Sequence, residues 1–367
     1  MLAVFDENVT WDDILLDEDH ASEPTVTTPK PKPKPTQIQK YKIAFERNNF
    51  ALADTAKIRR LSSIENYNFK SDITKVECLI DFIDIRFSTA KHYERSDLKT
   101  LITKILGHEH YIKKIQDNIF SIRFHDVKSY KDLFKRLNKI LHLTALKDVK
   151  DITIDMIELS TDFYLDHFDD ETAAALATAL FKSIRIPHDS KNVRLYRMSG
   201  ETFRLDCAST DITPFSNKDF IYHLSHGFNI GIGDQSKSYR HIYVKKTDTI
   251  DGIHTQLQQQ QQRVRCEWRV DSETMNTLLN TNIVNLSQLK KLITRMSSET
   301  KFTKFSGNIH PCAKYAFEHF PRTLGRERAE FNAKRYSKPQ LSKSVETFAT
   351  INQIIAKRHE KLACKFS

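Results

Sequence analysis

Alternation of apolar and polar residues predicts strands in the first half of the chain, with helical segments between them. Residues 74–88 are rich in valine, isoleucine and phenylalanine, and residues 119–125 and 152–165 have the same character. Leucine and isoleucine recur at helical spacing over residues 96–114 and 129–143. We therefore expect a strand, helix, strand, helix, strand order in this part of the chain.

The second half begins with a predicted helix over residues 170–183, after which predicted strands follow one another directly. The expected strands cover residues 193–199, 202–207, 228–233, 239–246 and 263–270, with a glutamine run in the turn before the last strand. Helical spacing returns over residues 271–279 and 286–296. This order predicts an α+β fold, with a mostly antiparallel sheet layered by helices and a helical C-terminal region.

Composition divides the chain into three regions. Residues 1–40 are acidic and then alternate proline with lysine from Thr28 to Thr36, which predicts a disordered tail with an extended spacer. A solubilising role explains this tail most simply, and docking of a host protein by its acidic-aromatic part is the alternative. Residues 72–270 are the expected α+β domain, and residues 271–367 form a helical and basic C-terminal region.

Charge and composition limit the kinds of partner and function that the chain can have. The chain of 367 residues carries a net charge of +10, which suits a polyanion such as DNA or RNA. It has 8 glycines and no P-loop motif, which argues against an ATPase. We find neither a long apolar run nor a signal peptide, so we expect a cytoplasmic protein without a membrane span. The 5 cysteines are dispersed, as is typical of reduced thiols rather than a zinc site.

Strand alternation brings carboxylates together on one face of the segment 155–165. Glu158, Ser160, Asp162 and Tyr164 fall on that face, because side chains two residues apart point the same way. A pair of carboxylates placed like this can chelate Mg²⁺ or Mn²⁺. The alternative is an ordinary solvated sheet face.

Two further segments carry chemistry on one face. In residues 263–270, Glu267 shares a face with the surrounding arginines, while valine, cysteine and tryptophan take the other face. In residues 239–246, one face carries Tyr239, His241, Tyr243 and Lys245. If these strands are neighbours, the shared face holds metal ligands, a phenol nucleophile and cations, which is what phosphodiester transfer requires. Surface ion pairs and half-buried packing are the alternatives.

Three segments, in this order, resemble the replication initiation factors of rolling-circle plasmids and filamentous phages, the Rep-trans family. Residues 154–163 read IDMIELSTDF, residues 231–246 read GIGDQSKSYRHIYVKK, and residues 263–269 read RVRCEWR. The resemblance implies metal ligation by Glu158, Asp162 and Glu267. It also places Tyr239, Tyr243 and Lys245 on the strand that bears the catalytic tyrosine.

The resemblance implies that residues 72–270 are a catalytic replication-initiator domain. It further implies a site-specific nick that leaves a 5′-phosphotyrosine and a free 3′-OH. Of the two tyrosines, Tyr239 is favoured because it lies beside the polar turn, and Tyr243 is the alternative. The residues expected to contact DNA are Arg240, Lys246, Arg265 and Arg269. Origin DNA, a host helicase, a polymerase and a second copy of the chain are the expected partners.

Two other function classes compete with this hypothesis. A non-catalytic initiator or repressor that binds origin DNA would explain the charge and the helical C-terminal region. An RNA-binding or structural protein with a basic face is a third class. Neither of them requires a tyrosine beside carboxylates.

Overall fold

The structure is a computed structural model that describes residues 64–69, 71–146, 148, 152–185, 192–197, 202–206, 215–250, 253–305, 318 and 345–366. The chain divides into two compact units. The main unit comprises residues 68–173, 231–301 and 349–367. The other unit comprises residues 1–67, 174–230 and 302–348.

A mostly antiparallel sheet forms the centre of the main unit. Its strands follow the order β2-β3-β1-β4-β11-β8, and each neighbouring pair among them is antiparallel. The end of β7 (Asn229–Gly233) comes next to β8. The bounds are β1 (Ile73–Ser88), β2 (Ile112–Gln116), β3 (Ile119–Val127), β4 (Thr153–Leu165), β8 (Ser238–Lys245) and β11 (Arg263–Asp271).

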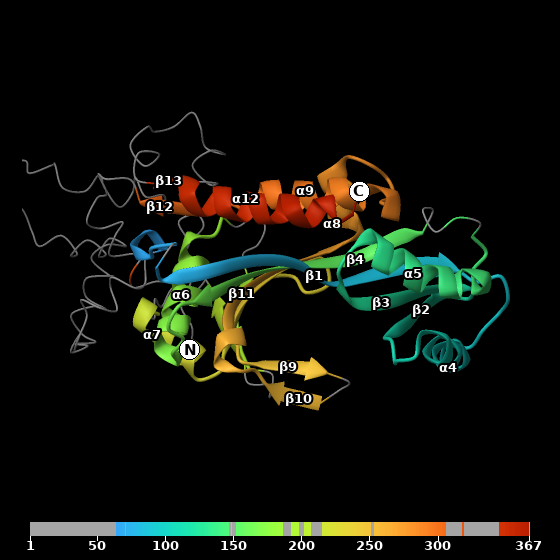
Figure 1. Ribbon diagram of the computed structural model, residues 1–367, viewed down its shortest axis with the longest axis horizontal. Helices are drawn as coiled ribbons and strands as arrows, with labels where there is room; N and C mark the ends of the chain where they lie inside the picture. Colours follow the sequence, from blue (N-terminus) through green and yellow to red (C-terminus); the bar gives the residue numbers. More distant parts are fainter. Residues whose placement is uncertain are drawn as a thin grey trace, which may run out of the picture. The chain divides into compact units, whose positions relative to one another are not determined.

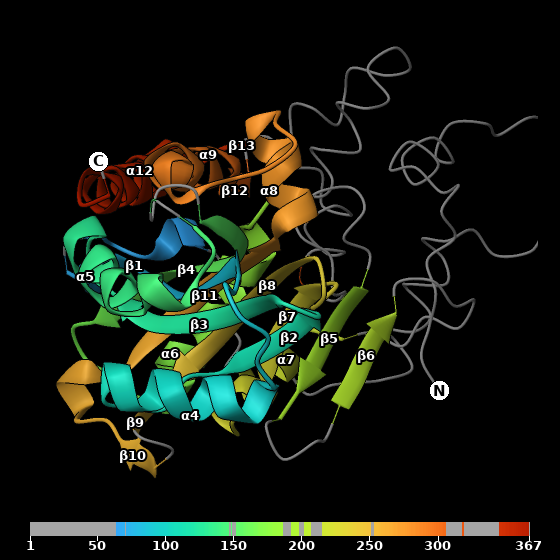
Figure 2. The ribbon, with the colours of Figure 1, turned by 90° about the vertical axis from the view of Figure 1, so that its right-hand side faces the viewer.

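Helices bury their apolar stripes against one face of this sheet. Leu292 and Ile293 of α9 belong to the same buried cluster as Trp268 and Val270 of β11. In Figure 1, α9 and α12 run side by side along this face, and Figure 2 shows α5 on the same side of the sheet. The helices of the main unit are α4 (Arg95–Leu106), α5 (Tyr130–Ile140), α8 (Ser272–Leu279), α9 (Leu289–Glu299) and α12 (Ala349–Cys364).

Side chains at the helix ends explain where these helices begin and stop. Asp271 accepts a hydrogen bond from the Thr274 amide at 2.9 Å and so caps the start of α8. Gly107, with a φ of 87°, ends α4 in the left-handed conformation that glycine adopts without strain. The prediction that this helix continues to residue 114 is therefore wrong, and residues 112–116 form the edge strand β2 instead.

A two-stranded hairpin follows β8. Its strands are β9 (Thr247–Ile250) and β10 (Ile253–Gln256), and the sequence pattern did not predict them. The glutamine run lies in the connection to β11, as expected, where Gln259–Gln261 form a 3₁₀ turn. Figure 1 shows the hairpin on the side of the sheet opposite to α9 and α12. The other 3₁₀ turns are η1 (Ile64–Asn66), η2 (Leu141–Leu143) and η5 (Leu286–Gln288).

The other unit has its own helices and strands. Phe181 and Phe220 pack ring against ring at 5.0 Å between its two helices. These helices are α6 (Asp170–Ser183), most of which belongs to this unit, and α7 (Asn217–Ser225). Its antiparallel pairs are β5 (Asn192–Tyr196) with β6 (Thr202–Asp206), and β12 (Thr303–Phe305) with β13 (Val345–Thr347).

The α+β fold with a mostly antiparallel sheet layered by helices is confirmed. The described helices after residue 271 confirm the helical C-terminal region, although α8, α9 and α12 share the main unit with the strands. The tail predicted to be disordered lies outside the described residues. Within them, no helix is long and apolar enough to span a membrane. Cys78 and Cys266 are free thiols.

Candidate functional site

Strand register brings the predicted polar side chains onto one face of the sheet. Arg265 of β11 lies opposite Asp162 of β4 on one side and Tyr243 of β8 on the other. Glu267 lies opposite Ser160 and His241 in the same way. Residues directly opposite each other on antiparallel strands share a face. The three segments are therefore neighbours, as the predicted site required, and this surface is called the polar face below.

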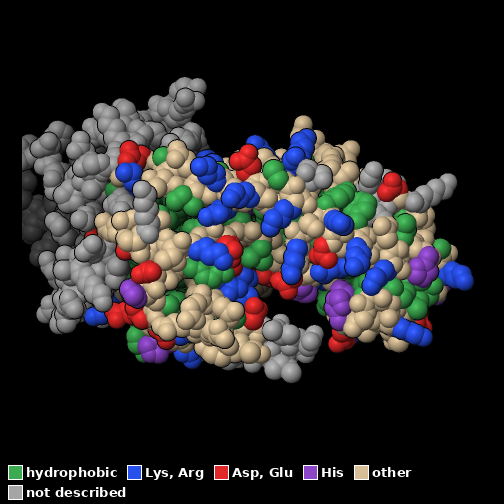
Figure 3. Space-filling model, in the orientation of Figure 1, with side chains coloured by type: hydrophobic (Ala, Val, Ile, Leu, Met, Phe, Trp, Pro, Cys, Tyr) green, Lys and Arg blue, Asp and Glu red, His purple; other side chains and the backbone are tan. Residues whose placement is uncertain are grey.

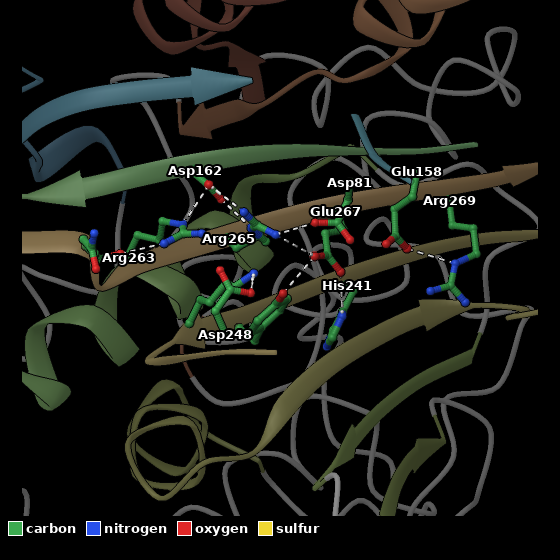
Figure 4. Close-up of polar contacts among 12 residues, drawn as sticks. Asp81, Glu158, Asp162, His241, Asp248, Arg263, Arg265, Glu267 and Arg269 are labelled. Atoms are coloured by element: carbon green, nitrogen blue, oxygen red, sulfur yellow. Dashed lines mark hydrogen bonds and ion pairs between the residues drawn. The ribbon is translucent and has the colours of Figure 1, made fainter. Parts of the chain in front are cut away.

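Three carboxylates converge near the middle of the polar face. One oxygen each of Asp81, Glu158 and Glu267 lies within 4.8 Å of the other two (Figure 4). Glu158 and Glu267 are 3% and 7% exposed, while the side chain of Asp81 is 26% exposed. Three carboxylate oxygens at this spacing could hold a metal ion. The structure thus brings together two of the three predicted ligands and adds a third that the sequence pattern missed.

Asp81 joins the cluster because of an irregularity in β1. Ile80 lies opposite Leu159 and Phe82 lies opposite Glu158, so Asp81 is an extra residue without a partner on β4. Such a bulge re-aims a side chain that strict alternation would send elsewhere. Alternation places Asp81 with Ile83 on the apolar face, so no signal in the sequence pattern assigns it to this site.

Arginines hold the carboxylates in position. Nη1 of Arg265 lies 2.6 Å from Oδ1 of Asp81 and 3.6 Å from Oε1 of Glu267. Nε of Arg269 lies 2.9 Å from Oε2 of Glu158. Figure 4 shows these side chains extending along the same surface. The cluster is therefore anchored by charge-assisted hydrogen bonds from two side chains of a single strand, β11.

The three carboxyl groups differ in their affinity for protons. Burial, and then the charge of Glu267, raise the pKa of Glu158 to about 8 and also raise the pKa of Asp81. Burial acts in the same direction on Glu267, but the hydrogen bond and charge of His241, with the charge of Arg265, outweigh it and lower its pKa to about 2. The raised values follow first from burial of the two carboxyl groups and then from the charge of Glu267. A bound cation would offset both effects, so this donor set could hold a metal ion.

Asp162 is not part of the carboxylate cluster, although the sequence suggested it as a metal ligand. Its fully buried carboxylate accepts hydrogen bonds from Nε of Arg263 at 2.8 Å and from Nε and Nη2 of Arg265 at 2.6 and 2.8 Å. Burial lowers the pKa of Arg265, but the bonds and charge of Asp162 outweigh it, and the net shift is upward. Asp162 therefore orients the arginine that contacts Asp81 and Glu267, and its charge is already compensated by two cations.

Tyr243 lies directly beside the cluster. Its hydroxyl donates a hydrogen bond to Oε1 of Glu267 at 2.8 Å, and Nδ1 of His241 lies 3.0 Å from Oε2 of the same carboxylate. The rings of His241 and Tyr243 are stacked with centroids 4.3 Å apart. Burial, and then the charge of Glu267, raise the pKa of Tyr243 well above its usual value. The phenol is therefore protonated at neutral pH and fixed in orientation by Glu267.

Tyr239 has the same strand parity but a different environment. Only 2% of this residue is exposed. A β-carbon built on Gly231 would lie 2.0 Å from the Tyr239 hydroxyl, so the phenol packs directly on the backbone of Gly231. Only glycine leaves room for this contact. The structure thus gives Tyr243, rather than the favoured Tyr239, the position next to the carboxylates.

The four predicted basic contacts fall in different places. Arg240 is 4% exposed on the opposite, apolar face, where its guanidinium lies 4.1 Å from the Trp268 ring centroid. Burial lowers the pKa of Arg240 to about 10. Because its side chain lies on the apolar face, Arg240 is not part of the polar face. Arg265 is buried within the cluster frame, and Arg269 is partly exposed beside Glu158. Lys246 is partly exposed and pairs with an aspartate of α6 at 2.6 Å.

Lys245, predicted to act in catalysis, pairs with Asp248 of the hairpin at 3.1 Å. It lies on β8 beyond Tyr243, two residues from the phenol along the strand. The polar face thus combines a carboxylate cluster, an arginine frame and one phenol bonded to the cluster. No protein-family model matches the chain, and no curated protein or solved structure is similar to it.

Proposed function

We propose that this protein is a divalent-metal-dependent DNA nicking and closing enzyme whose nucleophile is Tyr243. The observation that carries the proposal is the 2.8 Å hydrogen bond from Tyr243 to Glu267, which is itself a member of the Asp81, Glu158 and Glu267 cluster. A phenol held against a candidate metal ligand can reach a phosphate that the same ion polarises. A purely structural ion-pair network does not require this juxtaposition.

The chemistry follows from the residues present. Asp81, Glu158 and Glu267 would hold the ion, which would polarise the scissile phosphate and offset the developing charge. Tyr243 forms a bond from its phenolic oxygen to phosphorus as the bond from phosphorus to the 3′ oxygen breaks. The phenolic proton leaves to water, and the departing 3′ oxygen takes one up from water. Because the phosphodiester is exchanged for a phosphotyrosine, the strand can be rejoined without ATP.

Glu267 orients the nucleophile rather than acting as a strong base. Its low pKa, about 2, makes its carboxylate a hydrogen-bond acceptor that stays ionised at neutral pH. His241 holds the second oxygen of the same carboxylate at 3.0 Å and thereby restricts its rotation. The phenol is then positioned before DNA arrives, which reduces the entropy lost on reaching the reactive geometry.

DNA is the substrate class that the charge favours. Exposed lysines and arginines cover the outer sides of α9 and α12, and Figure 3 shows such side chains gathered over the region of α12 and β1. Counterion release from DNA phosphates would make binding to such a surface strongly salt-dependent. The exposed cations of the two helices are Lys290, Lys291, Arg295, Lys357, Arg358 and Lys361.

The biological role that we propose is initiation of rolling-circle replication, which rests on the resemblance of the three sequence segments to Rep-trans initiators. A nick that leaves a free 3′-OH provides a primer for a polymerase. Origin DNA is the proposed partner, with a host helicase, a polymerase and a second copy of the chain as further partners of such a role. Mg²⁺ or Mn²⁺ is the proposed ion.

The test is nicking of supercoiled plasmids that carry candidate origins, in the presence of Mg²⁺ or Mn²⁺. The wild-type protein should convert supercoiled plasmid to open circles and form a protein–DNA adduct that survives SDS. Tyr243→Phe should abolish both products. Tyr239→Phe serves as the matched control, since it removes a hydroxyl from the same strand and should leave nicking in place.

Three outcomes would contradict the proposal. Nicking that persists in Tyr243→Phe and disappears in Tyr239→Phe would move the nucleophile to Tyr239. Nicking that is unaffected by EDTA would exclude a role for the carboxylate cluster in metal binding. Tight origin binding with no nick and no adduct at any candidate origin would favour the non-catalytic initiator or repressor.

A further inference from the structure

A row of alternating guanidinium groups and aromatic rings leads away from the carboxylate cluster. The guanidinium carbon of Arg269 lies 5.1 Å from the ring centroid of Phe82. On the other side, the guanidinium of Arg123 lies 3.7 Å from the same ring and 5.4 Å from the ring of Tyr111. All three distances are within the range of cation–π contacts. Arg269, Phe82, Arg123 and Tyr111 are called the basic–aromatic row below.

The row lies on the polar face throughout. Phe82 is opposite Glu158, the cluster carboxylate that Arg269 binds. The next residue of the same parity on β1, Asp84, is opposite Arg123 of β3. The amide of Arg123 donates to the carbonyl of Tyr111 at 2.9 Å, which places Tyr111 opposite Arg123 just before the edge strand β2. The row therefore crosses from the carboxylate cluster to the edge of the sheet.

The residues of the basic–aromatic row become more exposed toward the edge of the sheet. Phe82 is 2% exposed, so it is explained by packing beneath the two guanidinium groups. Tyr111 is 53% exposed, so folding leaves much of its ring in contact with water. Exposed Lys113 and His125 are its polar neighbours on the adjoining strands, while Asp84 is occupied by Arg123 through two bonds of 2.7 Å.

The space beside the row is open. In Figure 3 the surface is hollowed between the β9–β10 hairpin and the part of the main unit that contains α4 and β2. Figure 1 shows the hairpin on the side of the sheet opposite to α9 and α12, and α9 packs against the apolar face. The hairpin is therefore on the side of the polar face. Within the part of the chain that the structure describes, this hollow leaves room for a DNA strand between the carboxylate cluster and β2.

We propose that the basic–aromatic row binds single-stranded DNA beside the scissile phosphate, with an unpaired base stacked on Tyr111. Bases of a duplex already stack on one another, and only an unpaired base exposes its ring face to a protein side chain. Exposed Lys113 supplies positive charge for a phosphate beside that base, because the charge of Arg123 is already paired with Asp84. This inference rests on the proposed function, since it names the state in which the substrate of that site is held.

The experiment measures binding separately from chemistry. The full-length Tyr243→Phe protein is mixed with a fluorescein-labelled single strand of about ten nucleotides, a length within the usual site size, in the presence of EDTA. Tyr111→Ala should weaken binding by roughly 5- to 150-fold, the range expected for loss of one stacked base. Tyr111→Phe should bind like the parent, because the ring is retained. The control is Tyr222→Ala, which removes a tyrosine that is 59% exposed in the other unit and should have no effect.

An abasic strand and a salt titration separate stacking from charge. The penalty of Tyr111→Ala should vanish when the strand lacks its bases, and its salt dependence should match that of the parent. Lys113→Ala should instead lower the slope of log affinity against log salt by about 0.7, the value for one phosphate contact on a single strand. Binding of a blunt duplex should not respond to Tyr111→Ala.

Several results would overturn the inference. If Tyr111→Ala binds normal strands as tightly as the parent does, or if it loses as much affinity for abasic strands as for normal strands, no base is stacked on Tyr111. An equal loss for duplex and single strand would show that the tyrosine supports a general DNA surface. Failure of the proposed function looks different, because the wild-type protein would then lack nicking activity in Mn²⁺ while the base-dependent effect of Tyr111→Ala remained.

Discussion

Replacement of Asp162 by asparagine tests whether the buried ion-pair frame holds the site together. Asp162 is 0% exposed, and both of its arginine partners are buried. In the asparagine variant, Arg265 keeps its contact with Asp81 at 2.6 Å, whereas Arg263 loses its ion pair and keeps the hydrogen bond to the carbonyl of Gln261 at 2.7 Å. In asparagine, an NH₂ group also replaces one of the two carboxylate oxygens, and this group cannot accept a hydrogen bond from a guanidinium. We therefore expect a large loss of stability.

The size of the loss follows from desolvation. Removing one partner of a buried ion pair lowers the free energy of unfolding by about 3–5 kcal/mol, because the remaining charge stays buried without an opposite charge beside it. Asp155 on the same strand is the matched control. Its ion pair with Arg86 is partly exposed, with 40% of the arginine side chain accessible. Asp155→Asn should cost no more than about 1 kcal/mol.

Urea unfolding followed by the fluorescence of Trp268 measures both variants. The chain has 2 tryptophans, so a Trp11→Phe background leaves Trp268 as the sole reporter. This ring is buried on β11 and its Nε1 donates to Ser238 at 3.1 Å, so it follows unfolding of the main unit. If Asp162→Asn lowers the free energy of unfolding no more than Asp155→Asn does, the buried frame is not what stabilises this sheet.

Three other changes should have measurable effects. Mn²⁺ at about 100 times its dissociation constant should stabilise the protein by about 2.7 kcal/mol. For a unit of this size, this corresponds to a rise in Tm of about 5–11 °C, and Glu158→Gln should reduce that rise in a thermal scan. Burial lowers the pKa of His359 to about 4, so its stabilising contribution is complete above the unfolded value of about 6.5 and is lost as the pH falls toward 4. The free energy of unfolding should therefore fall by about 2 kcal/mol between pH 8 and pH 5. In His359→Gln, the free energy of unfolding measured in urea should change little over that interval. Gly231→Ala should cost about 1–3 kcal/mol through overpacking, and Tyr239→Phe should recover part of this loss in the double variant.

Each of these predictions has a control. Glu77→Gln, which removes a partly exposed carboxylate from β1, should leave the effect of Mn²⁺ on Tm unchanged. His92→Gln, a change at an exposed histidine, should retain the wild-type pH dependence. If Gly231→Ala and Tyr239→Phe instead have additive effects, the contact between these two residues does not limit the packing.

Much of the fold and part of the site follow from side-chain periodicity. Period-two alternation assigned Glu158, Glu267 and Tyr243 to one surface, because each strand sends alternate side chains to opposite faces. The same rule placed Trp268 on the apolar side. Helical spacing found α5 and α9 because their buried stripes must face a sheet. These features are local, and neighbouring residues suffice to specify them.

Local sequence patterns did not predict features that depend on the backbone conformation of one residue or on a neighbouring strand. α4 ends at Gly107, which is in the left-handed conformation, and the edge strand β2 depends on pairing with β3; helical spacing reports neither feature. Asp162 and Glu158 have the same strand parity and charge type, yet one is enclosed by arginines and the other joins the carboxylate cluster. Only the positions of the neighbouring side chains distinguish them.

The sequence by itself determined an α+β chain with an excess of positive charge and a polar sheet face bearing carboxylates and tyrosines. Strand periodicity is a property of the backbone, so these features needed no knowledge of distant contacts. Tertiary structure alone decided which groups meet. The bulge at Asp81 supplies the third carboxylate, the packing of Gly231 buries Tyr239, and the register of β8 against β11 sets Tyr243 beside Glu267. Each depends on how neighbouring strands of the sheet lie against each other, which periodicity within one segment does not specify.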